Sequence, residues 1–226
     1  MTASYRPLSR ALAPRSAYST AERRSDAAVH LAGLLVVFAG VPALLALTAM
    51  TRPETPALLG VAVYGGALAA MILCSAVYNI QRTSGLSWLW RRLDHSAIYV
   101  KIAGTYTPFA LLSGQGLALT AGLWGAAVLG VAMKLADPER FRWFALALYL
   151  GMGWGGVVAG QAMIAALPGG VIALMLAGGI TYTLGVAFYL WQGLPFHTTI
   201  WHVFVLVASL LFYAAVMLLV LTGPVA

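Results

Sequence analysis

Hydrophobic residues occupy most of this chain in seven long stretches that polar or turn-forming residues separate. A helix needs about 20 residues to cross a bilayer, and each stretch is close to that length. Seven spans with short loops use nearly the whole chain. The pattern therefore predicts an all-α fold, an integral membrane bundle of seven transmembrane helices forming a single domain over residues 28–226. The stretches cover approximately residues 29–50, 56–80, 95–114, 117–135, 141–165, 169–191 and 199–222.

The composition supports a membrane protein rather than a soluble one. The chain of 226 residues is 62% hydrophobic and only 8% charged, whereas a soluble domain has about 25% charged residues. The net charge is +7, but the basic residues are scattered at the ends of the stretches and form no stripe with stacking aromatic residues. This distribution argues against a nucleic-acid partner and favours membrane lipids as partners.

The basic residues also predict an orientation. Five arginines lie in residues 1–27, and the two connections on the same side carry further basic residues, whereas the opposite loops hold only Arg52. Because positive loops stay in the cytoplasm, we expect a cytoplasmic N-terminus and an outer C-terminus, in a bacterial inner membrane. The basic residues of those two connections are Arg82, Arg91, Arg92, Lys134, Arg140 and Arg142.

Residues 1–27 form a polar segment with no acidic residue before Glu22. They lack the apolar core of a secretory signal peptide. An Arg-rich segment poor in acids is typical of an organellar transit peptide and also of a cytoplasmic tail. The charge distribution favours the tail.

Several polar side chains fall where apolar stretches begin or end, and ionisable groups in a membrane are costly enough to suggest function. The predicted orientation brings Ser75, Asn79, Asp94, His95 and His202 toward the cytoplasmic side. His30 and His197 lie there too, and their simplest interpretation is a position at the water boundary.

Lys101 lies deeper in the third span, seven residues after Asp94 and on nearly the same helix face. Two interpretations remain open. The side chain could reach back to the membrane boundary, as long basic side chains do, or it could form an ion pair with Asp94 inside the bundle.

Four stretches of the chain resemble the hemolysin III family, the bacterial branch of the progestin and adiponectin Q receptor superfamily. Their order and spacing agree with the family pattern from about residue 20 to 215, although Asp26 replaces an asparagine. The longest stretch is the most specific. The matching residues are Glu22, Asp26, His30 and Gly33; the run 75–79; the run 93–109; and the run 200–205.

The resemblance implies a seven-helix fold with a zinc site on the cytoplasmic side, built from three histidines and an aspartate that holds the metal-bound water. It also links the chain to lipid-amide hydrolysis, membrane-fluidity homeostasis and haemolysis. Here Asn79 and Thr198 occupy two of the three ligand positions, His202 occupies the third, and Asp94 stands at the position of the aspartate. Thr198 therefore joins Ser75, Asn79, Asp94, His95, Lys101 and His202 in the candidate polar site.

Asparagine and threonine are poor zinc ligands beside imidazole, and a catalytic zinc normally has three protein ligands. We therefore expect no bound cofactor, assign no catalytic residue, and predict a non-catalytic or metal-depleted protein of membrane and lipid homeostasis. No Ser-His-Asp or Cys-His group is evident in the spacing.

The alternative is a zinc-dependent lipid-amide hydrolase whose metal site is rebuilt from His202, His95 and His197. His197 is five residues from His202, so on a continuous helix its side chain is turned away by about 140°. Small-solute transport has less support, because the chain shows no inverted repeat and few charged residues at mid-membrane depth.

Overall fold

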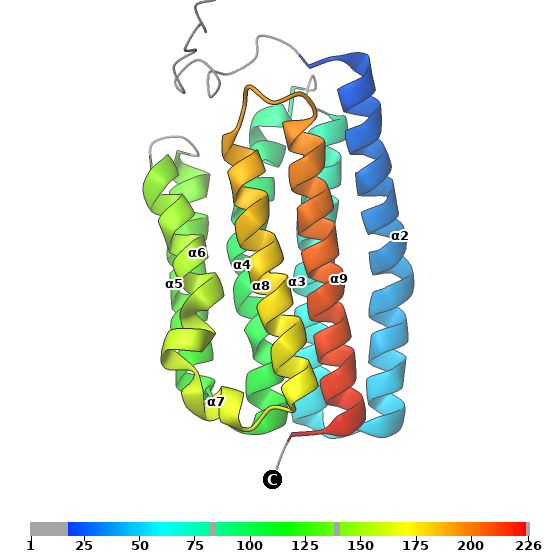
Figure 1. Ribbon diagram of the computed structural model, residues 1–226, viewed down its shortest axis with the longest axis vertical. Helices are drawn as coiled ribbons and strands as arrows, with labels where there is room; N and C mark the ends of the chain where they lie inside the picture. The colour runs from blue at the N-terminus through cyan, green and yellow to red at the C-terminus, as the bar shows by residue number, and fades with distance from the viewer. Residues whose placement is uncertain (1–17, 82–84, 138–140, 225–226) are drawn as a thin grey trace, which may run out of the picture.

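The computed structural model describes residues 18–81, 85–137 and 141–224, and every regular element in these ranges is a helix. The long helices form one bundle in which neighbours in sequence run in opposite directions, and the short helix α7 lies at one end of it (Figure 1). The helices are α2 (Thr20–Thr51), α3 (Thr55–Ile80), α4 (Ser87–Ser113), α5 (Leu117–Ala136), α6 (Arg142–Ala159), α7 (Gln161–Ala165), α8 (Gly169–Leu190) and α9 (His197–Thr222). Residues 1–17 of the predicted tail, and Arg82 and Arg140 of the charge count, lie outside the described residues.

Most of the predicted stretches become helices with nearly the predicted ends, because turn-forming residues stop them. Helix α4 is an exception, since it begins at Ser87, eight residues before the predicted start at residue 95. Gly114 and Gly116 adopt φ angles of +67° and +79°, a left-handed conformation that glycine accepts at little cost, and they separate α4 from α5. Pro168 precedes α8, where its missing N–H is harmless.

The first helix begins earlier than its apolar stretch, at Thr20 rather than near residue 29. The Ser19 hydroxyl accepts a hydrogen bond from Glu22 N at 3.1 Å, and Ser19 N donates to the Glu22 carboxylate at 2.7 Å. This reciprocal capping box satisfies two backbone donors of the first turn. The part of the predicted tail from Thr20 onward is therefore helical.

The fifth predicted stretch is divided at Gly160 into α6 and the short helix α7, which gives eight helices among the described residues. Five of them, α2, α3, α5, α8 and α9, are long and apolar enough to cross a bilayer. The chain is an integral membrane protein. Two points stay predictions. One is that α4 and α6 also cross the membrane, which would make seven spans, and the other is which end of the bundle faces the cytoplasm.

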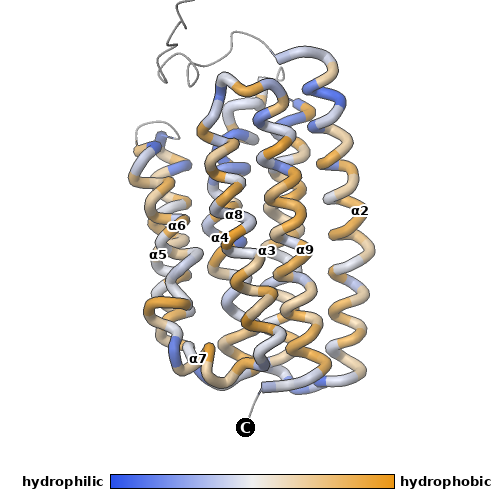
Figure 2. Tube along the Cα trace, in the orientation of Figure 1, coloured by the Kyte–Doolittle hydropathy of each residue, from blue (hydrophilic) through white to orange (hydrophobic). Residues whose placement is uncertain are grey.

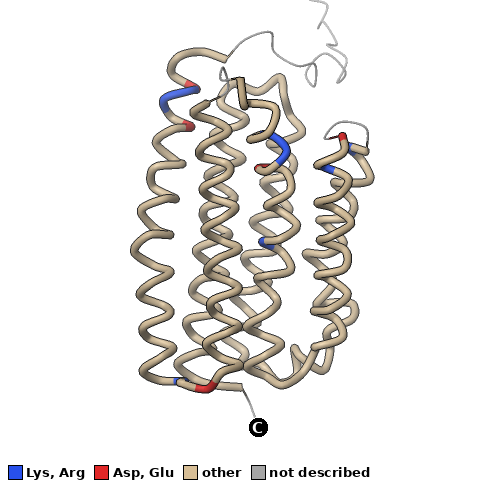
Figure 3. The backbone as a smooth tube through the Cα atoms, turned by 180° about the vertical axis from the view of Figure 1, so that it is seen from behind, with Lys and Arg blue, Asp and Glu red and all other residues tan. Residues whose placement is uncertain are grey.

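The outer surface of the bundle is apolar along its length. Phe38, Val128 and Val158 have 70%, 68% and 78% of their surface exposed, as expected of side chains that face lipid. Hydrophobic positions cover the middle of the helices (Figure 2), and charged positions gather toward the helix ends (Figure 3).

Helix α4 holds the bundle together from its centre. Tyr99 of α4 is fully buried, and its hydroxyl donates to the Ala145 carbonyl of α6 at 3.1 Å. Its ring lies directly against Gly130 of α5, where a Cβ would come within 2.5 Å of the ring. About two turns further along α4, the Tyr106 hydroxyl donates to the Gly153 carbonyl of α6 at 2.6 Å. These contacts fix α5 and α6 against the helix that carries Asp94, His95 and Lys101.

Candidate functional site

One end of the bundle collects most of the polar side chains, and we call it the polar end. Here α2, α4, α6 and α9 begin and α3, α5 and α8 finish. Glu22, Asp26 and His30 follow one another at intervals of four residues in α2, so they share one helix face. All three are buried in the bundle.

A short contact between side chains at the polar end joins α2 to α9. The Asp26 carboxylate accepts a hydrogen bond from His202 Nδ1 at 2.6 Å, with both side chains nearly buried. The His202 ring also meets the His30 ring edge-on, with 4.4 Å between the centroids. A charge-assisted hydrogen bond this short is among the stronger interactions available to the bundle.

His30 links α2 to α3, and its hydrogen bonds define its protonation. Nδ1 lies 2.8 Å from the Asp26 carbonyl oxygen, which can only accept, so Nδ1 carries a proton. Nε2 lies 3.1 Å from the Ser75 hydroxyl and 3.4 Å from the Asn79 amide nitrogen. The Asn79 amide also donates to the Ser75 carbonyl at 2.9 Å. These contacts fit a neutral His30 ring, in which Nε2 accepts a hydrogen bond from the Ser75 hydroxyl.

The turn before α9 is tied to the start of α2. The second carboxylate oxygen of Glu22 accepts from Phe196 N at 2.8 Å, and Phe196 has a left-handed φ of 59°. His197 Nε2 lies 2.8 Å from the Tyr18 hydroxyl, and the two rings stack. Thr198 Oγ1 faces the same hydroxyl at 3.4 Å. His197 and Thr198 therefore belong to the packing around Tyr18.

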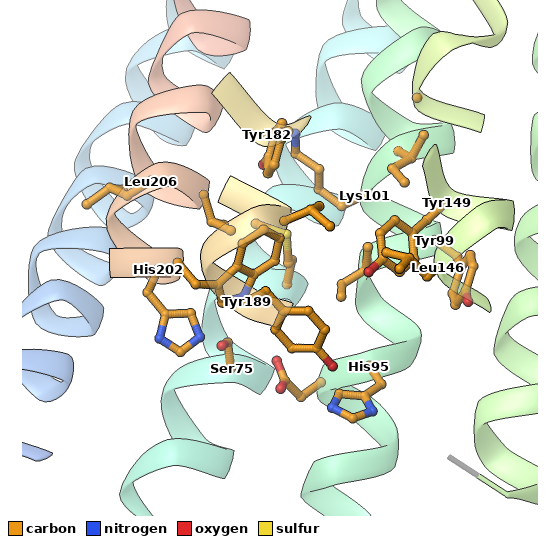
Figure 4. A pocket seen from close by; sticks show the side chains of 18 of the residues that line it. Ser75, His95, Tyr99, Lys101, Leu146, Tyr149, Tyr182, Tyr189, His202 and Leu206 are labelled. Carbon is orange, nitrogen blue, oxygen red and sulfur yellow. The ribbon is translucent and has the colours of Figure 1, made fainter. Parts of the chain in front are cut away.

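A cavity of about 440 Å³ runs from the polar end into the bundle. Ser75, His95 and His202 lie toward one end of it, and Lys101 and Tyr182 lie toward the other (Figure 4). Its size is within the range of pockets that take small-molecule ligands. Apolar and aromatic side chains form most of the wall, among them Ile102, Tyr149, Val205 and Leu206.

Asp94 and His95, at the start of α4, both line this cavity. The His95 ring faces the ring of Tyr78 edge-on at 6.5 Å between centroids. His95 is thus beside the cavity but outside the cluster that Asp26, His30 and His202 form.

Neither interpretation of Lys101 from the sequence describes its position. The side chain is 3% exposed, and Nζ lies over the rings of Tyr182 and Phe212, 4.5 and 4.8 Å from their centroids. It extends toward Tyr182 and away from Ser75 and His95 (Figure 4), so it does not reach back to the polar end. Among the described residues, no hydrogen bond or ion pair involves Nζ, and the Asp94 pair is not formed. Cation–π contacts take its place.

The residues of this chain at the zinc-ligand positions of the hemolysin III family pattern do not suit a zinc ion. Of Asn79, Thr198 and His202 only His202 offers an imidazole, and amide and hydroxyl oxygens are poor zinc ligands beside it. The rebuilt set of His202, His95 and His197 is not assembled either. Within the described ranges, the side chains that bring possible ligand atoms together, within 4.8 Å of one another, are Asp26, His30 and His202.

Asp26 and His30 belong to the polar cluster, although neither is among the candidate site residues predicted from the sequence. The signal that could have found them is their spacing, because Glu22, Asp26 and His30 repeat every four residues. The apolar stretch of the first span begins only near residue 29, so hydrophobicity alone does not place Glu22 and Asp26 on the same helix as His30. The contact between His30 and Ser75 spans 45 residues of sequence, so no local pattern could reveal it.

Comparisons with known proteins agree with the resemblance. The family model described as "Haemolysin-III related" matches residues 20–213. Hemolysin-3 of Bacillus cereus is 36% identical over 205 residues, which cover 88% of this chain and 92% of that protein. The Hemolysin-3 homolog of Bacillus subtilis is 34% identical over 197 residues, covering 85% and 91%. The human monocyte to macrophage differentiation factor is a more distant relative, 29% identical over 170 residues that cover 68% and 67%.

Proposed function

The chain belongs to the haemolysin-III related family, and from this premise we propose that it acts on membrane lipids without zinc at the family's ligand positions. Its role is in the lipid homeostasis of a bacterial inner membrane, with the polar end in the cytoplasm. The observation that carries the proposal is the 2.6 Å hydrogen bond between Asp26 and His202. This carboxylate engages the one histidine left at a family ligand position.

The cavity supports lipids as the partners. It is bordered mainly by apolar and aromatic side chains, and it reaches the buried polar cluster at one end. An amphiphile from the bilayer can place its chain along the wall and its polar group near Ser75 and His202.

The proposal is tested by membrane order in living cells. A strain that lacks the gene should show an altered membrane-order signal from an environment-sensitive lipid dye, and the wild-type chain should restore it. Asp26→Ala should fail to restore it, whereas the exposed carboxylate variant Glu54→Gln should succeed. Full restoration by Asp26→Ala, at equal protein level, would contradict the role of this hydrogen bond.

One observation favours a second candidate, the zinc-dependent lipid-amide hydrolase. Possible ligand atoms of Asp26, His30 and His202 lie within 4.8 Å of one another. If these side chains hold a metal, the purified protein should contain it in a near one-to-one ratio and lose it in His30→Ala. A metal that is also lost in Asn79→Ala and Thr198→Ala would instead lie at the family positions.

A further inference from the structure

Ser75, His30 and Asn79 meet at the cavity in the arrangement that nucleophilic catalysis requires. The Ser75 hydroxyl is 3.1 Å from His30 Nε2, within the range of a nucleophile bonded to its general base. Ser75 and His30 both line the cavity, so a ligand there can reach them. We propose that Ser75 is a metal-independent nucleophile that His30 activates for acyl transfer from the ester of a long-chain amphiphile.

The tautomer of His30 is the one that a general base needs. Its Nδ1 donates to the Asp26 carbonyl at 2.8 Å, which leaves the lone pair of Nε2 directed at Ser75. The Asp26 carboxylate lies 3.8 Å from the same Nδ1. When Nε2 takes a proton, this nearby negative charge stabilises the imidazolium, as the aspartate of a catalytic triad does.

Asn79 supplies a donor where negative charge would develop. One of its amide hydrogens goes to the Ser75 carbonyl at 2.9 Å, and Nδ2 is also 3.5 Å from Ser75 Oγ. The same amide nitrogen lies 3.4 Å from His30 Nε2, so the Asn79 amide faces the Ser75–His30 pair. An acyl oxygen that becomes an oxyanion next to Oγ can accept a hydrogen bond from this amide. The asparagine that replaces a zinc ligand thus has a role of its own.

The reaction balances without a metal or a redox partner. Ser75 Oγ forms a bond to the acyl carbon while its proton passes to His30 Nε2. The ester C–O bond breaks, and the same proton leaves with the alcohol. Water then attacks the acyl-serine, gives a proton to Nε2, and releases the carboxylic acid as the proton returns to Ser75. The inference deepens the proposed function and rests on it for the lipid substrate.

Labelling with a long-chain alkyl fluorophosphonate tests the nucleophile directly. The probe forms a P–O bond to an activated serine and releases fluoride, and peptide mass spectrometry of the purified full chain locates it. We expect the label on Ser75, with a chelator present, and its loss in Ser75→Ala. The matched control Ser96→Ala, at a buried serine without a hydrogen-bond partner among the described residues, should keep the label.

Two further variants separate catalysis from folding. His30→Gln should slow labelling by about 10²–10⁴-fold, the usual contribution of a general base. Asn79→Ala keeps the Ser75–His30 pair and should slow turnover of a fluorogenic palmitate ester by about 10²–10³-fold, the effect of losing one oxyanion donor. Each variant is compared with wild type at equal thermal stability or corrected for its folded fraction.

A folded wild-type chain that leaves Ser75 unlabelled would overturn this inference while leaving the zinc-free role in lipid homeostasis intact. Labelling that survives in His30→Gln at the wild-type rate would also overturn it. Ester turnover that needs stoichiometric zinc would overturn the metal-independent step, and it would overturn the proposed function as well if the zinc is lost in Asn79→Ala and Thr198→Ala.

Discussion

Asp26 is the residue that most distinguishes the polar end of this chain. The family pattern that it resembles has asparagine at this position, and here the added negative charge bonds to His202. Both side chains are nearly buried, so either partner left alone would keep an unsatisfied polar group. The pair couples the first helix to the last, at the end where the cavity opens.

Asp26→Asn should therefore destabilise the protein by about 1.5–3 kcal/mol, the usual contribution of a hydrogen bond to a charged group. Unfolding of the purified protein in detergent measures the change. Glu54→Gln removes an exposed carboxylate near the start of α3 and should leave stability nearly unchanged. Equal effects of the two substitutions would mean that the Asp26–His202 contact contributes nothing.

Lys101 gives a second prediction at this scale, because its ammonium contacts aromatic rings rather than Asp94. In double-mutant cycles, Lys101→Met should couple to Tyr182→Leu by about 0.5–2 kcal/mol, the range of cation–π contacts. With Asp94→Asn it should be additive within about 0.5 kcal/mol, as expected for sites without direct contact. A strong coupling energy between Lys101→Met and Asp94→Asn would instead support the Lys101–Asp94 ion pair that the sequence suggested.

At the scale of helices, the packing of α4 against α5 depends on the absence of a side chain at Gly130. Gly130→Ala would place a Cβ within 2.5 Å of the Tyr99 ring, which is itself bonded to α6. We expect a loss of about 1–3 kcal/mol from this overpacking.

Gly125 is the matched control on the same helix, since a Cβ there meets nothing within 4 Å. Gly125→Ala should change stability by no more than about 1 kcal/mol, and in the favourable direction through helix propensity. A Gly130→Ala variant as stable as Gly125→Ala would show that the close contact of Tyr99 with Gly130 does not limit the packing of α4 against α5. Thermal unfolding of both variants provides the comparison.

The helices were largely predictable, because apolar length and turn residues act locally. Gly114, Gly116 and Pro168 end or begin helices where the sequence placed breaks. The early start of α2 was missed because a capping box, rather than hydrophobicity, sets it at Ser19. The site was less predictable. Ser75, Asn79 and His202 were recognised, but the contact of His30 with Ser75 depends on how α2 packs against α3.

At the scale of the whole molecule, all the long helices start or end at the polar end, and the predicted orientation puts that end in the cytoplasm. Reporter fusions test both the direction and the number of crossings. A reporter that is active only in the cytoplasm should work at the N-terminus and in the connection at residues 82–84. A reporter that needs export should work at the C-terminus. The same reporter active at both termini would exclude an odd number of crossings.

The central proposal is that the bundle works without zinc at the ligand positions that the family resemblance implies. Zinc content per chain, measured on protein purified from zinc-supplemented cells, tests it most directly. Wild-type protein should carry far less than one equivalent. The combined variant Asn79→His and Thr198→His restores three imidazoles and should gain close to one equivalent, which His202→Ala should then remove. A full equivalent of zinc in the wild-type chain, lost on His202→Ala, would contradict the account.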